Sequence, residues 1–307
     1  MPRRIVIDTD PGVDDAVAIL LALASPELEV VALTTVTGNV HLDKTTLNAR
    51  RLLELAGRPD VVVAAGMAEA LAGSPAHEGG VHGEDGLGDL AWDEPTVRVH
   101  PDDAVEVLRA AIEGGPLTIV AIGPLTNLAV LLQRHPGIDE RVERVVIMGG
   151  ASLMGNVTPA AEFNVWADPE AARDVFEARW PMAIMPLDLT HQAFLNDDDL
   201  AHLRSLGTEV GRRCADMLEP YAAFHERWYG NRDIIMHDAT AVYELIDPTA
   251  IESEGVEATV ETGGQYSRGA TWFDRRPAHR ASRTRVGVRL DNDRFRALIR
   301  ERLATFR

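Results

Sequence analysis

The stretch Ile5-Val6-Ile7-Asp8-Thr9-Asp10-Pro11-Gly12-Val13-Asp14-Asp15 decides the fold of this chain. Its first three residues are apolar and β-branched, which is typical of a strand that is buried on both faces. Residues 13–24 are mostly apolar over a length that suits a helix. The stretch therefore predicts a strand that turns, across a run of acidic residues, into a helix.

The same alternation of β-branched runs and amphipathic stretches continues through the first two thirds of the chain. The runs that predict further buried strands are residues 30–33, 61–63, 118–122, 145–148 and 183–185. The stretches that predict helices between them are residues 43–56, 102–113, 125–134 and 169–179. Strands and helices that alternate at this spacing are joined by right-handed crossovers and form a mainly parallel sheet.

We therefore expect an α/β fold with a mainly parallel, open, Rossmann-like sheet flanked by helices. The last third is predicted to be helical at 197–206, 209–229 and 237–246, strand-rich at 256–288 and helical again at 293–306. No internal repeat or low-complexity linker divides the chain, so residues 1–307 are predicted to form one domain. The glycine-rich stretch 73–90 lacks either pattern, and loops of this length are usually functional.

The composition excludes disorder and several classes of partner. With 46% hydrophobic and 25% charged residues among 307, the chain has enough apolar side chains for a large core. Asp and Glu number 48 against 30 Lys and Arg, which gives a formal charge of −18. Nucleic acids and anionic membranes are bound through clustered basic residues, so neither is an expected partner. A neutral or cationic small ligand suits this charge better.

The cysteine content and the N-terminal residues point to a cytoplasmic protein. Cys214 is the sole cysteine, so neither an intrachain disulfide nor a cysteine zinc site can form. The N-terminal residues reach Asp8 too early for the apolar region of a signal peptide. Residues 16–24 are too short to span a bilayer.

Four carboxylates stand at the predicted turn after the first strand, those of Asp8, Asp10, Asp14 and Asp15. Ligands of open parallel sheets bind beyond the carboxyl ends of the strands. Such a cluster repels itself unless it holds a cation, and oxygen ligands without His or Cys select Ca²⁺ or Mg²⁺. Ca²⁺ tolerates irregular coordination better. The alternative is that these acids only cap the turn and the helix N-terminus, for which one or two would suffice.

Other predicted strand ends carry groups that suit a sugar. Asn39 can bind hydroxyl groups, although it can also be a turn residue after Gly38. A backbone carbonyl within 123–127 can face a metal ion, or the segment can be a plain strand-to-helix turn. The loop after Met148 runs through Asn156 to Glu162-Phe163-Asn164, which combines donors, acceptors and an apolar face.

His237 and Asp238 place a proton donor beside another carboxylate, just before an apolar helical run. Asp238 can equally be an ordinary helix N-cap, and a single histidine is most often structural.

At these positions the chain resembles the nucleoside hydrolases, the inosine-uridine-preferring nucleoside N-ribohydrolase group. The segment Asp8-Thr9-Asp10-Pro11-Gly12-Val13-Asp14-Asp15-Ala16 resembles the N-terminal signature of this family. The other matching segments follow in the family's order and are Thr37-Gly38-Asn39, His82-Gly83-Glu84-Asp85-Gly86-Leu87-Gly88, Gly123-Pro124-Leu125-Thr126-Asn127, Met148-Gly149-Gly150, residues 162–172 and His237-Asp238-Ala239. The resemblance implies the nucleoside hydrolase fold and hydrolysis of ribonucleosides to base and ribose.

The resemblance also implies roles for individual residues. It implies a Ca²⁺ ion held by Asp10, Asp15, Asp238 and the Thr126 carbonyl, with Asp14 as the base that takes a proton from a metal-bound water. The residues that it assigns to ribose are Asn39, Asn156, Glu162 and Asn164, with Met148 under the sugar. The residues that it places around the base are His82, Phe163 and His237. We also expect a homodimer or homotetramer.

The chemistry of the reaction agrees with these roles. Cleavage of an N-glycosidic bond passes through a ribosyl cation, which an acidic site stabilises, and a cation with a nearby carboxylate activates water. His237 is the candidate acid because the ordinary histidine pKa lies near neutrality. A purine N7 can accept its proton, which favours inosine-type substrates without excluding uridine or a pyrimidine-specific enzyme. The aromatic segment 221–229 either closes over the base or packs into the core or a subunit contact.

Two other functions share some of these sequence features. A phosphatase of the haloacid-dehalogenase type also begins with a strand that ends in Asp-x-Asp and binds Mg²⁺, but it needs a lysine near the site. Lys44 is the only lysine and lies in a predicted helix. A non-catalytic nucleoside-binding protein would lose Asp14 or the metal ligands, and all of these are present.

Overall fold

The protein is described by a computed structural model that covers residues 1–73 and 80–307. Its centre is an eight-stranded sheet in which every neighbouring pair runs parallel except the last, where the final strand is antiparallel. From edge to edge the strands are β3 (Val62–Ala65), β2 (Leu28–Thr35), β1 (Arg3–Thr9), β4 (Thr118–Ala121), β5 (Arg144–Met148), β6 (Met182–Met185), β12 (Thr284–Leu290) and β9 (Ile251–Gly255). The predicted α/β fold with a mainly parallel sheet is therefore confirmed.

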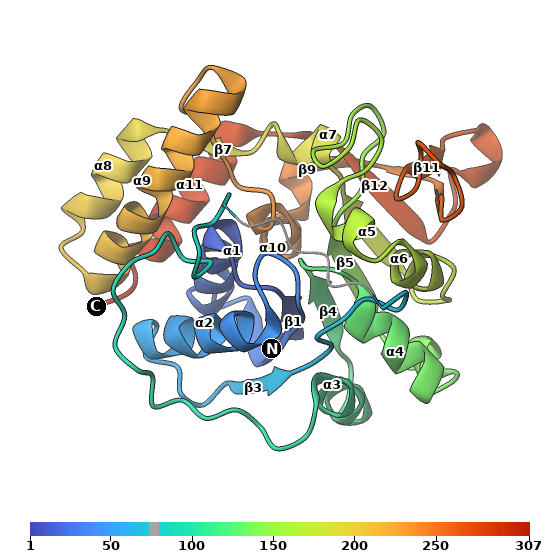
Figure 1. Cartoon of the computed structure of the whole chain (residues 1–307), viewed down its shortest axis with the longest axis horizontal. Coiled ribbons are helices and arrows are strands. Elements are labelled where there is room, and N and C mark those ends of the chain that lie inside the picture. The colour runs from blue at the N-terminus through green and yellow to red at the C-terminus, as the bar shows by residue number, and fades with distance from the viewer. Residues whose placement is uncertain (74–79) are drawn as a thin grey trace.

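Helices cover both faces of this sheet. They are α1 (Val13–Leu23), α2 (Leu42–Leu55), α3 (Ala104–Glu113), α4 (Thr126–Arg134), α5 (Phe163–Ala167), α6 (Pro169–Phe176), α7 (Leu187–Thr190), α8 (Asp197–Ser205), α9 (Glu209–Tyr229), α10 (Ala239–Ile246) and α11 (Asn292–Leu303). Figure 1 shows α8, α9 and α11 at one side of the molecule and α4, α5 and α6 at the opposite side. Two small ladders accompany the sheet, β7 (Phe194–Leu195) with β8 (Ile234–Ile235) and β10 (Glu257–Val260) with β11 (Thr271–Asp274).

The strands are apolar on both sides because both faces of the sheet are covered. Ile5 and Ile7 belong to the core cluster that contains side chains of α1, α2, α9, α10 and α11. Val6, which points the other way, belongs to the cluster that contains side chains of α3, α4 and α6. The β-branched runs of the sequence are thus the buried strands that they predict.

Some boundaries and short elements differ from the prediction. The helix expected from residue 237 begins at Ala239. The region 256–288 holds β10, β11 and most of β12, and the strand β9 precedes it. The one-turn helices α5 and α7 were not predicted, because four or five residues carry too little periodicity to reveal a helix. Of the loop 73–90, residues 74–79 lie outside the described part of the chain.

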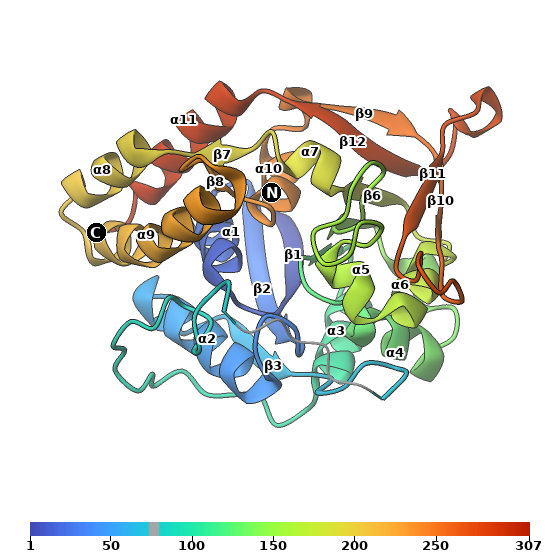
Figure 2. The same ribbon diagram turned by 45° about the horizontal axis from the view of Figure 1, so that its top comes forward.

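The carboxyl ends of the central strands β2, β1 and β4 form the functional edge of the sheet. β1 lies between β2 and β4, so the chain leaves β1 toward one side of the sheet and later returns to its other side. A crevice forms at such a switch point, outside the carboxyl ends of the strands. Figure 2 shows β10 and β11 at the periphery, away from this centre. Among the described residues, no helix has the length and apolar character that crossing a membrane requires.

Candidate active site

Three buried carboxylates converge at the functional edge of the sheet. Asp14 and Asp15 stand in the first turn of α1, and Asp238 directly precedes α10. One oxygen atom from each of the three carboxylates lies within 4.8 Å of the others. These helices pack against each other, so the first and last parts of the predicted metal site are brought together from segments more than 200 residues apart.

Asp15 is held in place by three donors. Its carboxylate accepts hydrogen bonds from Thr9 Oγ1 at 2.5 Å, Gly12 N at 2.9 Å and Asn39 Nδ2 at 3.0 Å. Gly12 is the N-cap of α1, so the Asp15 carboxylate satisfies the backbone N–H of the residue at the start of this helix. The alternative that these acids cap the helix is therefore true of Asp15, which also faces the acidic cluster.

Asp10 lies between two backbone segments that approach it closely. Its Oδ2 accepts a hydrogen bond of 2.7 Å from Asn39 N, whereas its Oδ1 is buried and has no hydrogen-bond partner among the described residues. A side chain at Gly38 or at Gly123 would collide with this carboxylate, so both positions need glycine. A buried carboxylate oxygen without a partner is expected where a ligand is bound.

Burial raises the pKa values of Asp10, Asp14, Asp15 and Asp238. It raises the pKa of Asp14 to about 8, an effect to which the charge of Asp15 adds. The pKa values of Asp10 and Asp238 are also raised, first by burial and then by the neighbouring carboxylates. Oxygen atoms of Asp14, Asp15 and Asp238 lie within 4.8 Å of one another, so these raised pKa values favour bound protons where no cation balances the charge. A cation in place of these protons would relieve the repulsion, so the donor set fits a hard divalent ion.

Thr126 was predicted to offer its carbonyl oxygen to the ion. Thr126 is the first residue of α4. Its hydroxyl donates a 2.8 Å hydrogen bond to Asp168 Oδ2. The same Asp168 oxygen accepts from Leu71 N at 2.8 Å. The role of the Thr126 carbonyl stays a prediction.

A cavity of about 120 Å³ opens beside the acidic cluster. Most of the predicted site residues line it, namely Asp14, Asn39, His82, Met148, Asn156, Glu162, Phe163, Asn164, His237 and Asp238. Asp10, Asp15 and Thr126 are not part of the lining. Its remaining residues are Val81, Ile122, Tyr221, Phe224 and His225.

The side of the cavity near β5 carries the carboxylate of Glu162 and the amides of Asn156 and Asn164. Glu162 caps α5 and accepts hydrogen bonds from the backbone N–H groups of Gly150, Asn164 and Val165, at 2.9 to 3.2 Å. Burial raises its pKa to about 7, although these donors oppose the shift. Asn164 Nδ2 donates to the main-chain carbonyl of Met148 at 3.2 Å, which fixes the Asn164 amide at the end of β5.

The opposite side of the cavity is aromatic. His82 Nδ1 accepts a 3.2 Å hydrogen bond from Val13 N and lies 3.9 Å from Asp14 Oδ1. Burial, with a smaller effect from His225, lowers the pKa of His82 to about 4. The Tyr221 ring lies between them, 5.3 Å from the ring of His82 and 4.6 Å from that of His225. These distances place the predicted aromatic segment at the cavity.

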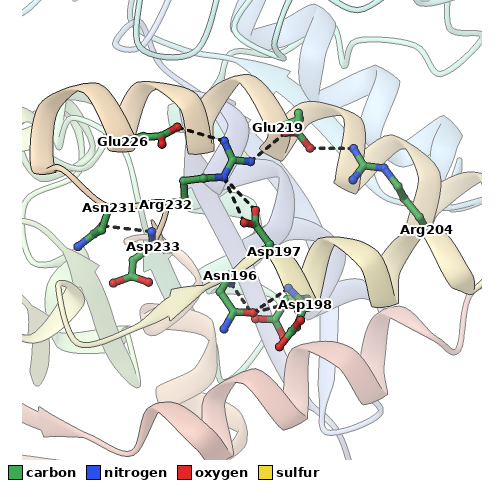
Figure 3. A network of polar contacts seen from close by, with 10 residues as sticks. Asn196, Asp197, Asp198, Arg204, Glu219, Glu226, Asn231, Arg232 and Asp233 are labelled. Carbon is green, nitrogen blue, oxygen red and sulfur yellow. Dashed lines mark hydrogen bonds and ion pairs between the residues drawn. The ribbon is translucent and has the colours of Figure 1, made fainter.

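The same aromatic segment also has an outward side. Trp228 is 69% exposed, whereas Tyr221 and His225 are buried. The chain that follows α9 is tied down by Arg232, which donates to Asp197 in α8 and Glu219 in α9 and pairs with Glu226 (Figure 3). This network anchors the connection from α9 to β8 and hence to His237.

His237 is less basic than the sequence suggested. Burial holds its pKa well below the ordinary value of 6.5, and the imidazoles of His191, His225 and His82 lower it further. The argument that its pKa lies near neutrality therefore does not hold for the folded protein. A neutral His237 can still act as a hydrogen-bond donor.

Two residues of α7 that sequence reasoning missed also support the site. Thr190 Oγ1 lies 2.7 Å from His237 Nδ1. Asp188 accepts hydrogen bonds from Ser152 N and Leu153 N, at 2.6 and 3.1 Å, and so holds the loop that carries Asn156. Both lie within five residues of the carboxyl end of β6, which is the signal that could have marked them.

A carboxylate cluster at the switch point of a parallel sheet, beside a cavity with polar and aromatic sides, defines an α/β enzyme for a small polar molecule. Comparison with known proteins identifies the class. The sequence profile of the inosine-uridine preferring nucleoside hydrolases matches residues 5–297. An inosine-uridine preferring nucleoside hydrolase of Leishmania major is 40% identical over 97% of this chain and 96% of its own. The pyrimidine-specific ribonucleoside hydrolase RihA of Shewanella woodyi is 40% identical over 90% of this chain and 89% of its own.

Solved structures agree with the sequence comparison. A plant nucleoside hydrolase superposes with a TM-score of 0.93 at 35% identity, over 99% of this chain and all of the other. A purine-preferring ribonucleoside hydrolase of Gardnerella vaginalis superposes with a TM-score of 0.94 at 30% identity, over 99% of each chain. The chain belongs to the inosine-uridine preferring nucleoside hydrolase family. It is an N-ribohydrolase, and the resemblance inferred from the sequence motifs is confirmed.

Proposed function

We propose that this enzyme is a Ca²⁺-dependent hydrolase of inosine- and uridine-type ribonucleosides, with Asp14 as the base that activates water. One observation carries the proposal. A buried trio of carboxylates borders a cavity whose other walls offer amide groups to a sugar and aromatic rings to a base.

The chain's own residues suit a calcium ion. Asp10, Asp15 and Asp238 would hold it, and Asp10 Oδ1 is a buried oxygen for which residues 1–73 and 80–307 supply no hydrogen-bond partner. These are hard oxygen donors in an irregular arrangement, which Ca²⁺ accepts more readily than Mg²⁺ does. When bound, the ion would act as a Lewis acid that makes water a better nucleophile.

Asp14 and Asp238 are the carboxylates of the trio that line the cavity, and because Asp238 is assigned to the ion, Asp14 is the one left to act on water beside the substrate. In the proposed reaction, water attacks C1′ of the ribose and gives its proton to Asp14 while the bond to the base breaks. Positive charge develops on the ribosyl group, and Glu162 and the acidic cluster face that charge. The cavity lining, as far as the structure describes it, contains neither lysine nor arginine that would oppose it.

The groups around the base allow two substrate preferences. A neutral His237 that donates a hydrogen bond can serve a purine N7 or a pyrimidine carbonyl oxygen, because both are acceptors. The relatives share this fold although their names differ in the base, so the preference does not follow from the fold. A pyrimidine-specific ribonucleoside hydrolase, as RihA is named, is therefore the second candidate.

Release of reducing sugar tests activity and preference together. We expect ribose from inosine and uridine, loss of activity with a chelator, and recovery with Ca²⁺ but not with Mg²⁺ at equal concentration. Activity on uridine and cytidine alone would favour the pyrimidine-specific enzyme. Full activity after exhaustive chelation would contradict the calcium requirement.

A further inference from the structure

We propose that Thr190 is a positioning residue, whose hydroxyl holds the His237 imidazole so that its Nε2–H faces the nucleobase. The inference rests on the proposed function, because it concerns how the leaving base is activated. Thr190 is the last residue of α7 and is completely buried, and His237 lines the cavity.

The hydrogen bond between them is built on a rigid backbone. β7 and β8 pair through Phe194 and Ile235, and Met236 N donates to Ala193 O at 2.9 Å, which continues the ladder toward the site. On the other side of His237, Thr240 Oγ1 donates to its carbonyl oxygen at 2.6 Å. The main chain of His237 is therefore fixed, and the orientation of the ring is what Thr190 determines.

The direction of the hydrogen bond follows from the surroundings of Thr190. Among the described residues, His237 Nδ1 is the only hydrogen-bond partner of this hydroxyl. A buried hydroxyl proton needs an acceptor, so Thr190 donates and Nδ1 accepts. Nδ1 then carries a lone pair, the ring proton resides on Nε2, and Nε2 is the nitrogen left for a ligand in the cavity.

An Nε2–H donor matters most when the leaving base is a poor anion. As the bond from C1′ to the base breaks, its electron pair moves into the base, and a hydrogen bond to an acceptor of the base stabilises that charge. The net reaction places hydroxide on C1′ and a proton on the base, both from water. A substrate whose leaving group is already a stable anion, such as p-nitrophenyl riboside, needs no such donor.

The test compares Thr190→Val and Thr190→Ser on inosine or uridine and on p-nitrophenyl riboside. Removal of the hydroxyl by Thr190→Val should lower kcat on the nucleoside by about 10- to 100-fold, the usual effect of losing such a supporting contact. It should leave kcat on p-nitrophenyl riboside within a factor of three or so, and Thr190→Ser should recover the nucleoside activity. Thr118→Val is the matched control, because it removes another buried hydroxyl, which has no hydrogen-bond partner within the described part of the chain. Thr118 is the first residue of β4 and so lies at the end of the strand away from the site.

Other outcomes would overturn the inference. An equal loss on both substrates would mean that Thr190 only supports the fold, and no loss on either would mean that the hydrogen bond is dispensable. In a His237→Ala background, Thr190→Val should have no further effect on the nucleoside, and an additive loss contradicts the proposal. If Thr190→Val does not fold, Thr190→Ala is measured in the same way. A wild-type enzyme that releases no ribose from any nucleoside would instead refute the proposed function.

Discussion

Replacement of Asp14 by asparagine tests two effects of this carboxylate, its effect on the free energy of unfolding and its role in turnover. Asp14 is 5% exposed, and burial, together with the charge of Asp15, raises its pKa to about 8 from an ordinary value of 3.8. Asp14→Asn keeps the shape of the side chain but removes the charge. We expect the variant to lose turnover and, without metal, to resist high pH better than the wild type.

The magnitude follows from the linkage between protonation and folding. A pKa that is higher in the folded chain means that the folded state keeps a proton that the unfolded chain has lost. The free energy of unfolding therefore falls as the pH rises from about 4 to about 8. Each pH unit within this window costs about 1.4 kcal/mol for one such group. Between pH 6 and pH 8, Asp14 alone should lower the stability of the metal-free protein by about 2 to 3 kcal/mol.

Urea unfolding followed by circular dichroism, in chelator at pH 6 and at pH 8, measures this difference. The stability of Asp14→Asn should fall by about 2 to 3 kcal/mol less than that of the wild type over this range. With Ca²⁺ present, its kcat on inosine should be lower by about 10²- to 10⁴-fold, the usual contribution of a general base. Asp93→Asn, which removes an exposed charge, should change neither quantity. An unchanged pH dependence, or a kcat within tenfold of the wild type, would refute the reasoning.

Two further substitutions test the metal site and the sugar side of the cavity. Gly38→Ala places a methyl group against Asp10 Oδ2 and should weaken Ca²⁺ binding at least about tenfold in calorimetry, and unchanged affinity would argue against Asp10 as a ligand. Glu162→Gln replaces an acceptor of three backbone hydrogen bonds by an amide that cannot accept them all, so it should lower stability by about 1–3 kcal/mol in urea unfolding and raise the KM for inosine. A variant as stable as the wild type would show that these bonds are replaced by others.

The sequence predicts the parallel sheet well because each central strand is apolar on both faces. Ile5, Val6 and Ile7 are all completely buried, and no turn or polar residue interrupts them. The edge strand β9 was missed, because Ile251 is the only apolar side chain in its Ile-Glu-Ser-Glu-Gly sequence, and the segment forms a strand through pairing with β12. Local pattern thus identifies apolar strands, the edge strand β3 included, whereas a polar edge strand such as β9 depends on its neighbour.

The candidate site is predictable where strand ends supply it. Asp14, Asn39 and Glu162 follow β1, β2 and β5, and a parallel sheet brings such ends together. The perturbed acidity of His237 was not predictable, because it arises from burial and from histidines elsewhere in the chain. The contact between Thr190 and His237 was not predictable either, because Thr190 lies 47 residues before His237 in a helix of one turn.

Buried charges are usually paired with opposite charges, but the buried carboxylates of this site are not. Asp8 is stabilised by neutral donors, since its Oδ1 accepts hydrogen bonds from Thr34 and Asn127. Asp10, Asp14 and Asp238 instead have pKa values that are raised first by burial and then by neighbouring carboxylates, with Asp15 among them in each case. The described cavity lining contains no basic side chain except histidines of low pKa. The protein therefore leaves the positive charge of this site to be supplied from outside. In the proposed reaction it comes first from the bound ion and then from the ribosyl group as its bond to the base breaks, so the arrangement that destabilises the empty site favours the transition state.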